Sequence, residues 1–223
     1  MKTNFLHDPN PDFERLYVFG AGGHGREIWW LVEQCWGTRV SVEFIVDRVE
    51  YLTDKVDGCP VRLLQDLPSP AGARYVVALG NSRDRERAAL QCEAHGLVAA
   101  SLIHPRVEAS RRIQFGPGCV IFAGSILTTN IDLGAHVHIN VHCSISHDVT
   151  IGEFTTLSPG VHVSGNVTIG RHVFLGTGAT IVNGAPGEPL EIGDDAIIAA
   201  GACVTGPVAP GSLVAGVPAI QKR

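Results

Sequence analysis

One histidine in the sequence lies beside a carboxylate in an arrangement that suits proton transfer. His147 is followed directly by Asp148, and Asn140 lies one hexad back along the chain, displaced by one position. A carboxylate that hydrogen-bonds an imidazole can hold the ring in one tautomer and increase its basicity, as a general base requires. The Asn140 amide is a candidate for orienting this base or contacting a substrate. We therefore predict that the catalytic residues are His147, Asp148 and Asn140.

A glycine-rich turn near the start of the chain has the spacing of a nucleotide-binding motif. Gly20, Gly22 and Gly25 form the pattern G-x-G-x-x-G between an apolar run and an amphipathic stretch. Such glycines let backbone N–H groups approach an anion at a helix N-terminus, although they also suit a tight turn without a ligand. Asp47 ends the next apolar run, where an acidic side chain often binds a ribose. The strand–helix–strand context favours the nucleotide site.

The residues around His147 belong to a six-residue repeat. From Ile103 to Ile181 an apolar residue occupies every sixth position, and a track of small or β-branched residues runs four positions behind it, from Val107 to Ala179. A period of six fits neither an α-helix nor a simple strand. It is typical of a parallel β-helix, in which short strands alternate with corners.

The repeat also predicts which residues stack on one another, because three hexads make one coil of about 18 residues. Thr129 then lies one coil below His147, and Gly165 lies one coil above it. We expect the glycine to leave open space for a ligand beside the imidazole. After Ile181 the segment Asn183–Leu190 breaks the phase and is rich in Gly and Pro, so we expect it to loop out of the shaft.

Histidines are concentrated in the repeat, and two of them have a spacing found in zinc sites. His142 and His147 form H-x4-H, which resembles the γ-class carbonic anhydrases. The third ligand of that class lies two coils earlier, where this chain has Arg106, and an Arg cannot bind zinc. We therefore predict no metal. Apart from His147, we expect most histidines of the repeat to face outward into solvent, among His136, His138, His142, His162 and His172.

The segment before the repeat has a different pattern. Apolar runs alternate with amphipathic stretches, which predicts a parallel α/β sheet of about four strands. This is half the size of a dinucleotide-binding fold, so NAD chemistry is not favoured. The expected strands are Arg15–Phe19, Val40–Val46, Arg74–Leu79 and Leu97–Ile103, and the expected helices cover residues 26–35 and Arg83–His95.

Composition restricts the partners and the compartment. The 223 residues carry a net charge of −5 and a pI near 6.0, which argues against nucleic acid or an anionic membrane as the main partner. The six cysteines form no C-x-x-C pair, and we see no leader or membrane span. We predict a cytoplasmic protein with a flexible tail at residues 1–14, an α/β domain at 15–102 and a β-helix at 103–223.

Several motifs occur together in both halves of the chain. They are Gly20–Gly25, Ala78–Asn81, Leu102–Pro105, Ser146–Asp148, Ser164–Asn166, Phe174–Gly176 and Gly216–Ala219. In combination they resemble the bacterial nucleotide-sugar acetyltransferases of the sialic-acid O-acetyltransferase and UDP-4-amino-sugar N-acetyltransferase family. The resemblance covers nearly the whole chain after the tail.

This resemblance implies a homotrimer of left-handed β-helices, with acetyl-CoA bound between neighbouring shafts. His147 matches the general base of the family, and Asp148 matches the neighbour that raises its basicity. The resemblance also implies nucleotide-sugar binding by the α/β domain and acetyl-CoA binding by the β-helix. The residues concerned are Gly22, Gly23, His24, Val46, Asp47 and Gly80 for the nucleotide sugar, and Gly165, Thr177 and Gly201 for acetyl-CoA.

Thr156 departs from the family pattern. Better-known members carry a second histidine at this position, on the acetyl-CoA side of the site, whereas a hydroxyl can donate a hydrogen bond but carries no charge. The expected activity is direct acetyl transfer to a nucleotide-linked 4-amino sugar. O-acetylation of a sialic acid or related sugar stays an alternative, as does a non-catalytic scaffold that binds nucleotide sugars.

Overall fold

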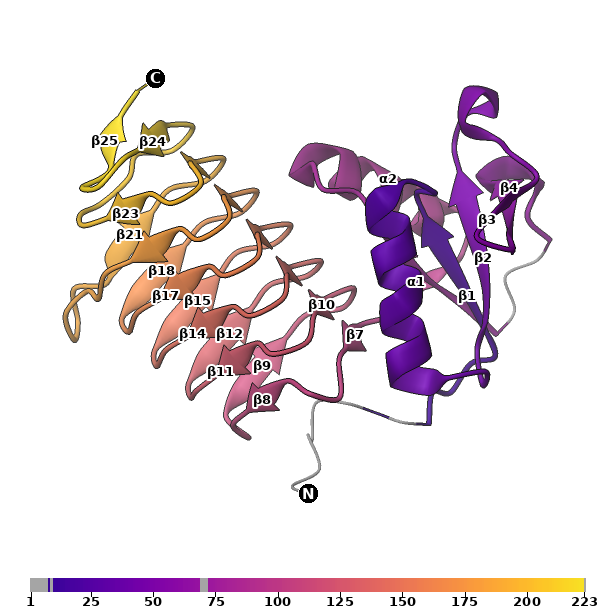
Figure 1. The fold of residues 1–223 in the computed structure, drawn as a ribbon, viewed down its shortest axis with the longest axis horizontal. Helices are drawn as coiled ribbons and strands as arrows, with labels where there is room; N and C mark the ends of the chain where they lie inside the picture. The colour runs from indigo at the N-terminus through magenta and orange to yellow at the C-terminus, as the bar shows by residue number, and fades with distance from the viewer. Residues whose placement is uncertain (1–7, 9, 69–71, 223) are drawn as a thin grey trace. The chain divides into compact units, whose positions relative to one another are not determined.

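The computed structural model describes residue 8, residues 10–68 and residues 72–222. The chain forms two compact units, with the boundary between Leu102 and Ile103. The first unit contains a β-sheet and two α-helices, and the second is a β-helix (Figure 1).

Within the described residues, the α/β unit has a six-stranded sheet in the order β3-β4-β2-β1-β5-β6. Neighbouring strands are parallel, except that β3 and β4 form an antiparallel hairpin at one edge. The strands are β1 (Arg15–Phe19), β2 (Ser41–Val46), β3 (Lys55–Val56), β4 (Cys59–Leu63), β5 (Ala73–Val77) and β6 (Val98–Ala99). The helices are α1 (Gly23–Trp36) and α2 (Ser82–Ala94), with 3₁₀ turns η1 (Val49–Tyr51) and η2 (Leu64–Asp66).

Three of the four predicted strands are confirmed as β1, β2 and β5. The fourth, Leu97–Ile103, is wrong as a single strand, because β6 ends this sheet whereas β7 (Leu102–Ile103) begins the β-helix. The apolar pattern did not predict the β3–β4 hairpin. Its strands are short, and Pro60 interrupts the hydrophobic run at the point where β4 pairs with the edge strand.

The two helices begin at the same edge of the sheet, because each follows the carboxyl end of a central strand. In α1 the buried residues Ile28, Leu31, Val32 and Cys35 recur at helical spacing and pack on the sheet, and the helix ends at Gly37, whose φ is +60°. Asn81 caps α2 by accepting a hydrogen bond from the Asp84 backbone N–H at 3.0 Å. The sheet therefore presents two helix N-termini at one edge.

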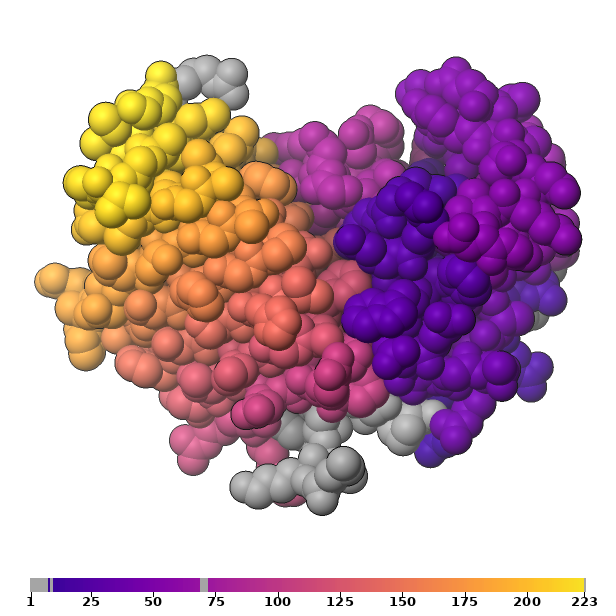
Figure 2. All heavy atoms as spheres, viewed as in Figure 1, coloured from indigo at the N-terminus to yellow at the C-terminus, as the bar shows by residue number. Residues whose placement is uncertain are grey.

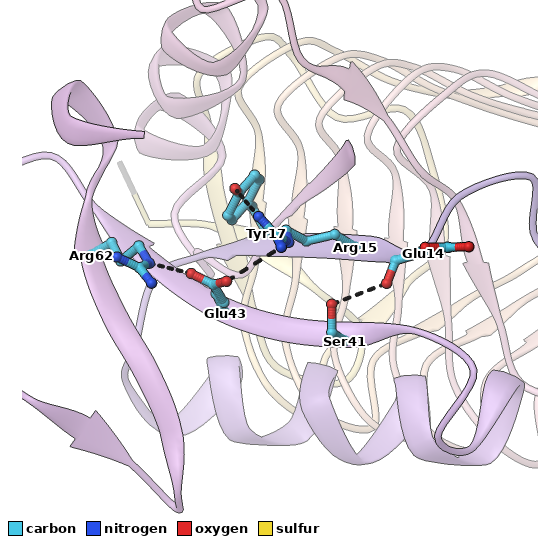
Figure 3. A network of polar contacts seen from close by, with 6 residues as sticks. All are labelled: Glu14, Arg15, Tyr17, Ser41, Glu43 and Arg62. Carbon is cyan, nitrogen blue, oxygen red and sulfur yellow. Dashed lines mark hydrogen bonds and ion pairs between the residues drawn. The ribbon is translucent and has the colours of Figure 1, made fainter. Parts of the chain in front are cut away.

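A polar network links the first strands of this sheet (Figure 3). Glu43 of β2 lies between Arg15 of β1, at 3.8 Å, and Arg62 of β4, whose Nε donates to it. Ser41 Oγ donates to the backbone oxygen of Glu14 at 3.0 Å. Exposed ion pairs of this kind contribute roughly 0–1 kcal/mol, so we assign them to strand order rather than to stability.

Part of the predicted tail is anchored to the α/β unit. Residues 1–7 and 9 of the tail lie outside the described residues. Trp36 Nε1 donates to the backbone oxygen of Asp8 at 2.8 Å, and the ring of Phe13 packs edge-on against Trp36. Arg74 forms an ion pair with Asp12 at 2.8 Å. The end of the tail nearest β1 thus adds contacts to α1 and to β5.

The β-helix consists of short strands that stack as three sheets within the described residues (Figure 1). One sheet contains β7 (Leu102–Ile103), β10 (Val120–Ile121), β13 (His138–Ile139), β16 (Thr156–Leu157), β19 (Phe174–Leu175), β22 (Ile197–Ile198), β24 (Leu213–Ala215) and β25 (Ile220–Gln221). The second contains β8 (Glu108–Ala109), β11 (Ile126–Leu127), β14 (Ser144–Ile145), β17 (His162–Val163), β20 (Thr180–Ile181) and β23 (Cys203–Val204). The third contains β9 (Ile113–Phe115), β12 (Ile131–Leu133), β15 (Val149–Ile151), β18 (Val167–Ile169) and β21 (Leu190–Ile192).

Both tracks of the repeat contribute to the buried core of the shaft. Every member of the small track is buried, and so is every member of the large track except Ala109 and Phe115, which are partly buried. In the register of the sheets, residues 18 apart are neighbours, such as Ile139 and Leu157. The chain therefore forms the predicted left-handed parallel β-helix with a continuous apolar core.

The insertion after Ile181 projects from the coil, as predicted (Figures 1 and 2). Ala185 and Glu188 exchange backbone hydrogen bonds at 3.0 Å and close a tight hairpin. Leu190 N then donates to Asn166 O at 3.0 Å, which returns the chain to the repeat. The stacking therefore continues across the insertion.

The prediction that most of the other histidines of the repeat are solvated is wrong, because three of the five are buried. His136 and His172, each 3% exposed, stack on opposite faces of the Phe154 ring, with ring centroids 4.9 and 5.5 Å apart. His138 is 1% exposed and lies in β13 between Val120 and Thr156 of adjacent coils. Stacking on aromatic or apolar neighbours at the same position of adjacent coils removes these rings from water. His142 and His162 are exposed, as predicted.

Candidate active site

His147 and Asp148 form the corner between β14 and β15. His147 Nδ1 lies 2.8 Å from Asp148 Oδ2, and the two side chains are 55% and 49% exposed. Asp148 has a φ of +57°, so the chain turns sharply just after the histidine. If Nδ1 carries the proton that Asp148 accepts, Nε2 has a free lone pair that can accept a proton from a substrate.

A third side chain, Asn130, completes this arrangement from the coil below. Asn130 Nδ2 donates to Asp148 Oδ1 at 3.0 Å. The hydrogen bonds from Asn130 and His147 lower the pKa of the Asp148 carboxyl below its ordinary value. The sequence interpretation did not include Asn130, although the 18-residue period that places Thr129 below His147 also places Asn130 below Asp148.

Gly165 stacks beside His147, as the period predicts, but it does not leave open space there. A Cβ added at Gly165 would lie 2.5 Å from His147 Cε1 and 2.6 Å from Nε2. The expectation of open space is therefore wrong, since the imidazole lies where a side chain at residue 165 would be. The binding of a ligand beside the ring stays a prediction. Gly165 instead allows the ring to lie close against the next coil.

The other residues predicted for this site do not all gather around His147. The Asn140 amide donates to the carbonyl of Leu157 at 2.9 Å, so it bonds to the next coil of the shaft. Thr156 lies in β16, 5% exposed. The roles of Asn140 and Thr156 stay predictions.

The predicted acetyl-CoA residues lie at two different corners. Asn166 N, next to Gly165, donates to His147 O at 3.0 Å, so Gly165 belongs to the corner of the histidine. Gly201 N donates to Thr177 O at 2.9 Å, which stacks these two residues at the corner that joins the first and second sheets. Both are exposed, and the Cβ position of Gly201 has open space around it. One chain therefore does not bring all three residues to one corner.

The α/β unit has a pocket of about 430 Å³ at the carboxyl edge of its sheet. Of the predicted nucleotide-sugar residues, Gly22, Val46 and Asp47 line it, together with Phe19 and Gly20 of the glycine turn. Gly23, His24 and Gly80 are not among the lining residues, and His24 Nδ1 lies 2.9 Å from Glu27. Further lining residues, missed in the sequence interpretation, come from the segment after β2, from the loop between β5 and α2, and from α2. They are Arg48, Tyr51, Thr53, Val56, Leu79, Asp84, Arg87, Ala88 and Gln91.

Two local features shape this pocket. A Cβ at Gly25 would overlap the Gly20 carbonyl oxygen, so the helix packs tightly on the turn only because residue 25 is glycine. The buried guanidinium of Arg85 donates to the carbonyls of Leu79 and Gly80, at 2.8 and 3.4 Å. This bond holds the loop between β5 and α2, and a sequence pattern offers no signal for it.

In the part of the chain that the structure describes, no group of three or more His, Cys, Asp or Glu side chains could hold a metal ion. No helix among the described residues has the length and apolar character needed to cross a membrane.

Two family models match the chain. Residues 15–91 match the PglD N-terminal domain, and residues 148–183 match the bacterial transferase hexapeptide repeat. The first match covers strands β1 to β5, the glycine turn and most of α2, and the second begins at Asp148. The two matches therefore fall in the two units: the first includes the glycine turn and Asp47, and the second includes Asp148 and Gly165 but starts just after His147.

Comparisons with whole proteins agree with this division. The chain is 33% identical over 183 residues to the GDP-perosamine N-acetyltransferase of Escherichia coli O157:H7, covering 79% of this chain and 81% of the relative. The structure of WeeI from Acinetobacter baumannii AYE matches with a TM-score of 0.88 and 32% identity, over 93% of this chain and 99% of WeeI. The acetyltransferase domain of PglB from Neisseria gonorrhoeae FA1090, in complex with acetyl coenzyme A, matches with a TM-score of 0.83 and 31% identity, over 94% and 99%. The chain belongs to the family of sugar acetyltransferases that join a PglD-type N-terminal domain to a left-handed β-helix of hexapeptide repeats.

Proposed function

We propose that this protein transfers an acetyl group from acetyl-CoA to the amino group of a nucleotide-linked amino sugar, with His147 as general base. The observation that carries the proposal is the His147–Asp148 pair, held at 2.8 Å and pressed against Gly165. The relative that acts on GDP-perosamine makes that nucleotide sugar the first substrate to test.

His147 performs the proton transfers in this mechanism. Its Nε2 accepts a proton from the sugar amine as the nitrogen attacks the thioester carbonyl and the C–N bond forms. The C–S bond then breaks, and the protonated His147 returns the proton to the departing thiolate. Asp148 stays ionised and stabilises the positive charge on the ring, which suits a carboxylate whose pKa is held below its ordinary value.

The pocket of the α/β unit is proposed to hold the nucleotide. Asp47 and Gln91 supply hydrogen-bonding groups for a ribose or a base, and Arg48 and Arg87 supply positive charge for phosphate oxygens. The Arg48 guanidinium lies 6.0 Å from the centre of the Tyr51 ring, so both side chains come from one wall. Gly22 allows the backbone to approach the ligand closely.

The acetyl-CoA site is proposed to need more than one copy of the chain. Thr177 and Gly201 are exposed at one corner of the shaft, whereas His147 and Gly165 lie at another. A cleft between neighbouring shafts would bring the two sets together, which supports the homotrimer. We also propose that the protein works in the cytoplasm.

The test is the release of CoA thiol from acetyl-CoA in the presence of GDP-perosamine. General-base help contributes about 10²- to 10⁴-fold, so His147→Ala should lower kcat by about that factor. His162→Ala is the matched control, because His162 is an exposed histidine of the same shaft whose ring lies 2.8 Å from Ser144 Oγ. Full activity of His147→Ala would refute the assignment of the base. Binding of nucleotide sugars without thiol release by the wild type would favour the scaffold function.

A further inference from the structure

Asn130, Asp148 and Asn166 occupy the same corner of three successive coils. Their φ angles are +52°, +57° and +55°, a left-handed conformation that Asn and Asp tolerate better than other non-glycine residues. Asp148 N donates to Thr129 O and Asn166 N donates to His147 O, so the backbone alone stacks these corners. If Asn130 had only a structural role, this left-handed backbone conformation would be all that the corner requires of it.

The side chain of Asn130 does more than suit the corner. Its Nδ2 donates to Asp148 Oδ1 at 3.0 Å, while Asp148 Oδ2 accepts from His147 Nδ1 at 2.8 Å. Thr129 Oγ1 makes a long hydrogen bond of 3.5 Å to Asn130 Oδ1, which places the amide NH₂ on the side of Asp148. Each carboxylate oxygen of Asp148 therefore accepts a hydrogen bond from a different side chain: Oδ1 from Asn130 and Oδ2 from His147.

This arrangement matters because the pair is open to solvent. Asp148 is 49% exposed, and packing alone does not fix the rotation of its carboxylate. Without a donor at Oδ1, the carboxylate can turn toward water and leave His147 Nδ1 without an acceptor. The imidazole proton can then move to Nε2, and a ring protonated at Nε2 cannot act as the base there.

We infer that Asn130 is a positioning residue for the acetyl transfer: its amide orients the Asp148 carboxylate, and thereby keeps the His147 proton on Nδ1 and the lone pair on Nε2. This inference rests on the proposed function. It assigns no contact between Asn130 and the substrate.

Two variants separate the positioning role of the Asn130 side chain from the role of its backbone in the corner. Asn130→Gly keeps the left-handed backbone accessible and removes the amide. Asn130→Asp keeps the size of the side chain but places an acceptor where Asp148 needs a donor. For both we expect kcat to fall about 2- to 10-fold, the effect of one net hydrogen bond, with the KM for acetyl-CoA unchanged. Asn166→Gly is the matched control at the same corner, because among the described residues the hydrogen bonds to the Asp148 carboxylate come from Asn130 and His147 and not from Asn166.

The deciding measurement is the tautomer of His147, observed by nitrogen NMR of protein labelled with ¹⁵N-histidine. The His147 signals are those lost in His147→Ala. In the wild type and in Asn166→Gly, we expect the neutral ring to carry its proton on Nδ1. In Asn130→Gly and Asn130→Asp, we expect a mixture with the Nε2-protonated form.

A double variant adds a second check. Asn130→Asp combined with Asp148→Asn exchanges the two groups, so a hydrogen bond between positions 130 and 148 can form again while the anion no longer faces His147. We expect the thermal stability of the double variant to equal that of the wild type, but its kcat to stay low. Recovery of kcat together with stability would mean that the 130–148 bond is only structural, and would overturn the inference.

The inference and the proposed function can fail separately. If His147→Ala keeps full activity, the proposed base is wrong. If His147→Ala is inactive but Asn130→Gly and Asn130→Asp keep the wild-type tautomer, only the role of Asn130 is wrong, whatever happens to kcat.

Discussion

Gly165 of the β-helix and Gly25 of the α/β unit both lie where a side chain would collide with a neighbour, but the neighbours differ in kind. At Gly165 the neighbour is the His147 ring, a side chain that can rotate away. At Gly25 it is the carbonyl of Gly20 in the backbone of the preceding turn, which cannot move without the strand. Glycine therefore allows the correct position of a catalytic side chain in the β-helix, and close backbone packing in the α/β unit.

Among the variants that test this contrast between the two glycines, the largest effect is expected for Gly165→Ala. The new methyl group would lie 2.5 Å from His147 Cε1, so the ring must leave its position. Misplacement of a catalytic group by about 1 Å can cost about 10²-fold in rate, and we expect a loss of kcat of that order. Steady-state kinetics measure the loss, and the melting temperature should change little.

Gly206→Ala is the control for this variant, since a Cβ at Gly206 has no atom within 4 Å. Gly206→Ala should match the wild type in kcat and stability. If Gly165→Ala unfolded the protein instead, Gly165 would be needed for folding, as Gly25 is, and the proposed difference between the two glycines would be wrong.

Gly25→Ala should have the opposite profile. Overpacking against a backbone carbonyl costs roughly 1–3 kcal/mol, so we expect the α/β unit to unfold at a lower temperature and the KM for the nucleotide sugar to rise. The KM for acetyl-CoA should stay the same, because the proposed acetyl-CoA residues belong to the β-helix. Thermal unfolding and kinetics with each substrate measure these changes.

Gly23→Ala is the stability control for Gly25→Ala. Gly23 starts the same helix, and a Cβ there meets no atom within 4 Å. Its melting temperature should not fall, because replacing a helical Gly by Ala is favourable by roughly 0.5–1 kcal/mol. Equal destabilisation by both variants would show that the turn needs glycine for its conformation and not for close packing.

The difference between the units also explains what the sequence could predict. In the β-helix, a fixed period makes residues 18 apart neighbours, so the position of Gly165 beside His147 followed from counting. The period does not specify rotamers, which is why the Asn130 amide, the filled space at Gly165 and the stacking of His136 on Phe154 were not predicted. In the α/β unit, the glycine turn and Asp47 follow from local pattern. Tyr51 and Gln91 reach the same pocket from η1 and from α2. The loops that place these two elements have no sequence period, so no spacing predicts that the two residues meet.

The smallest effect is expected for Cys143→Ser. Cys143 is on the small inward track, 1% exposed, and its Sγ lies 3.3 Å from the carbonyl of Ser158. Burial raises the pKa of this thiol to about 11. A hydroxyl can make the same hydrogen bond. The thiolate is the reactive form of cysteine, and a thiol with a raised pKa forms little of it, so Cys143 should take no part in the reaction. We therefore expect kcat to stay within about twofold of the wild type.

Mass spectrometry of the Cys143 peptide checks this prediction directly. Cys143 is buried and burial raises the pKa of its thiol, so iodoacetamide should label it slowly in the folded protein and quickly only after unfolding. During turnover the peptide should carry no acetyl group. An acetylated Cys143 would mean that the acyl group passes through the core of the shaft, and the contrast between a corner that performs chemistry and a core that only packs would then fail.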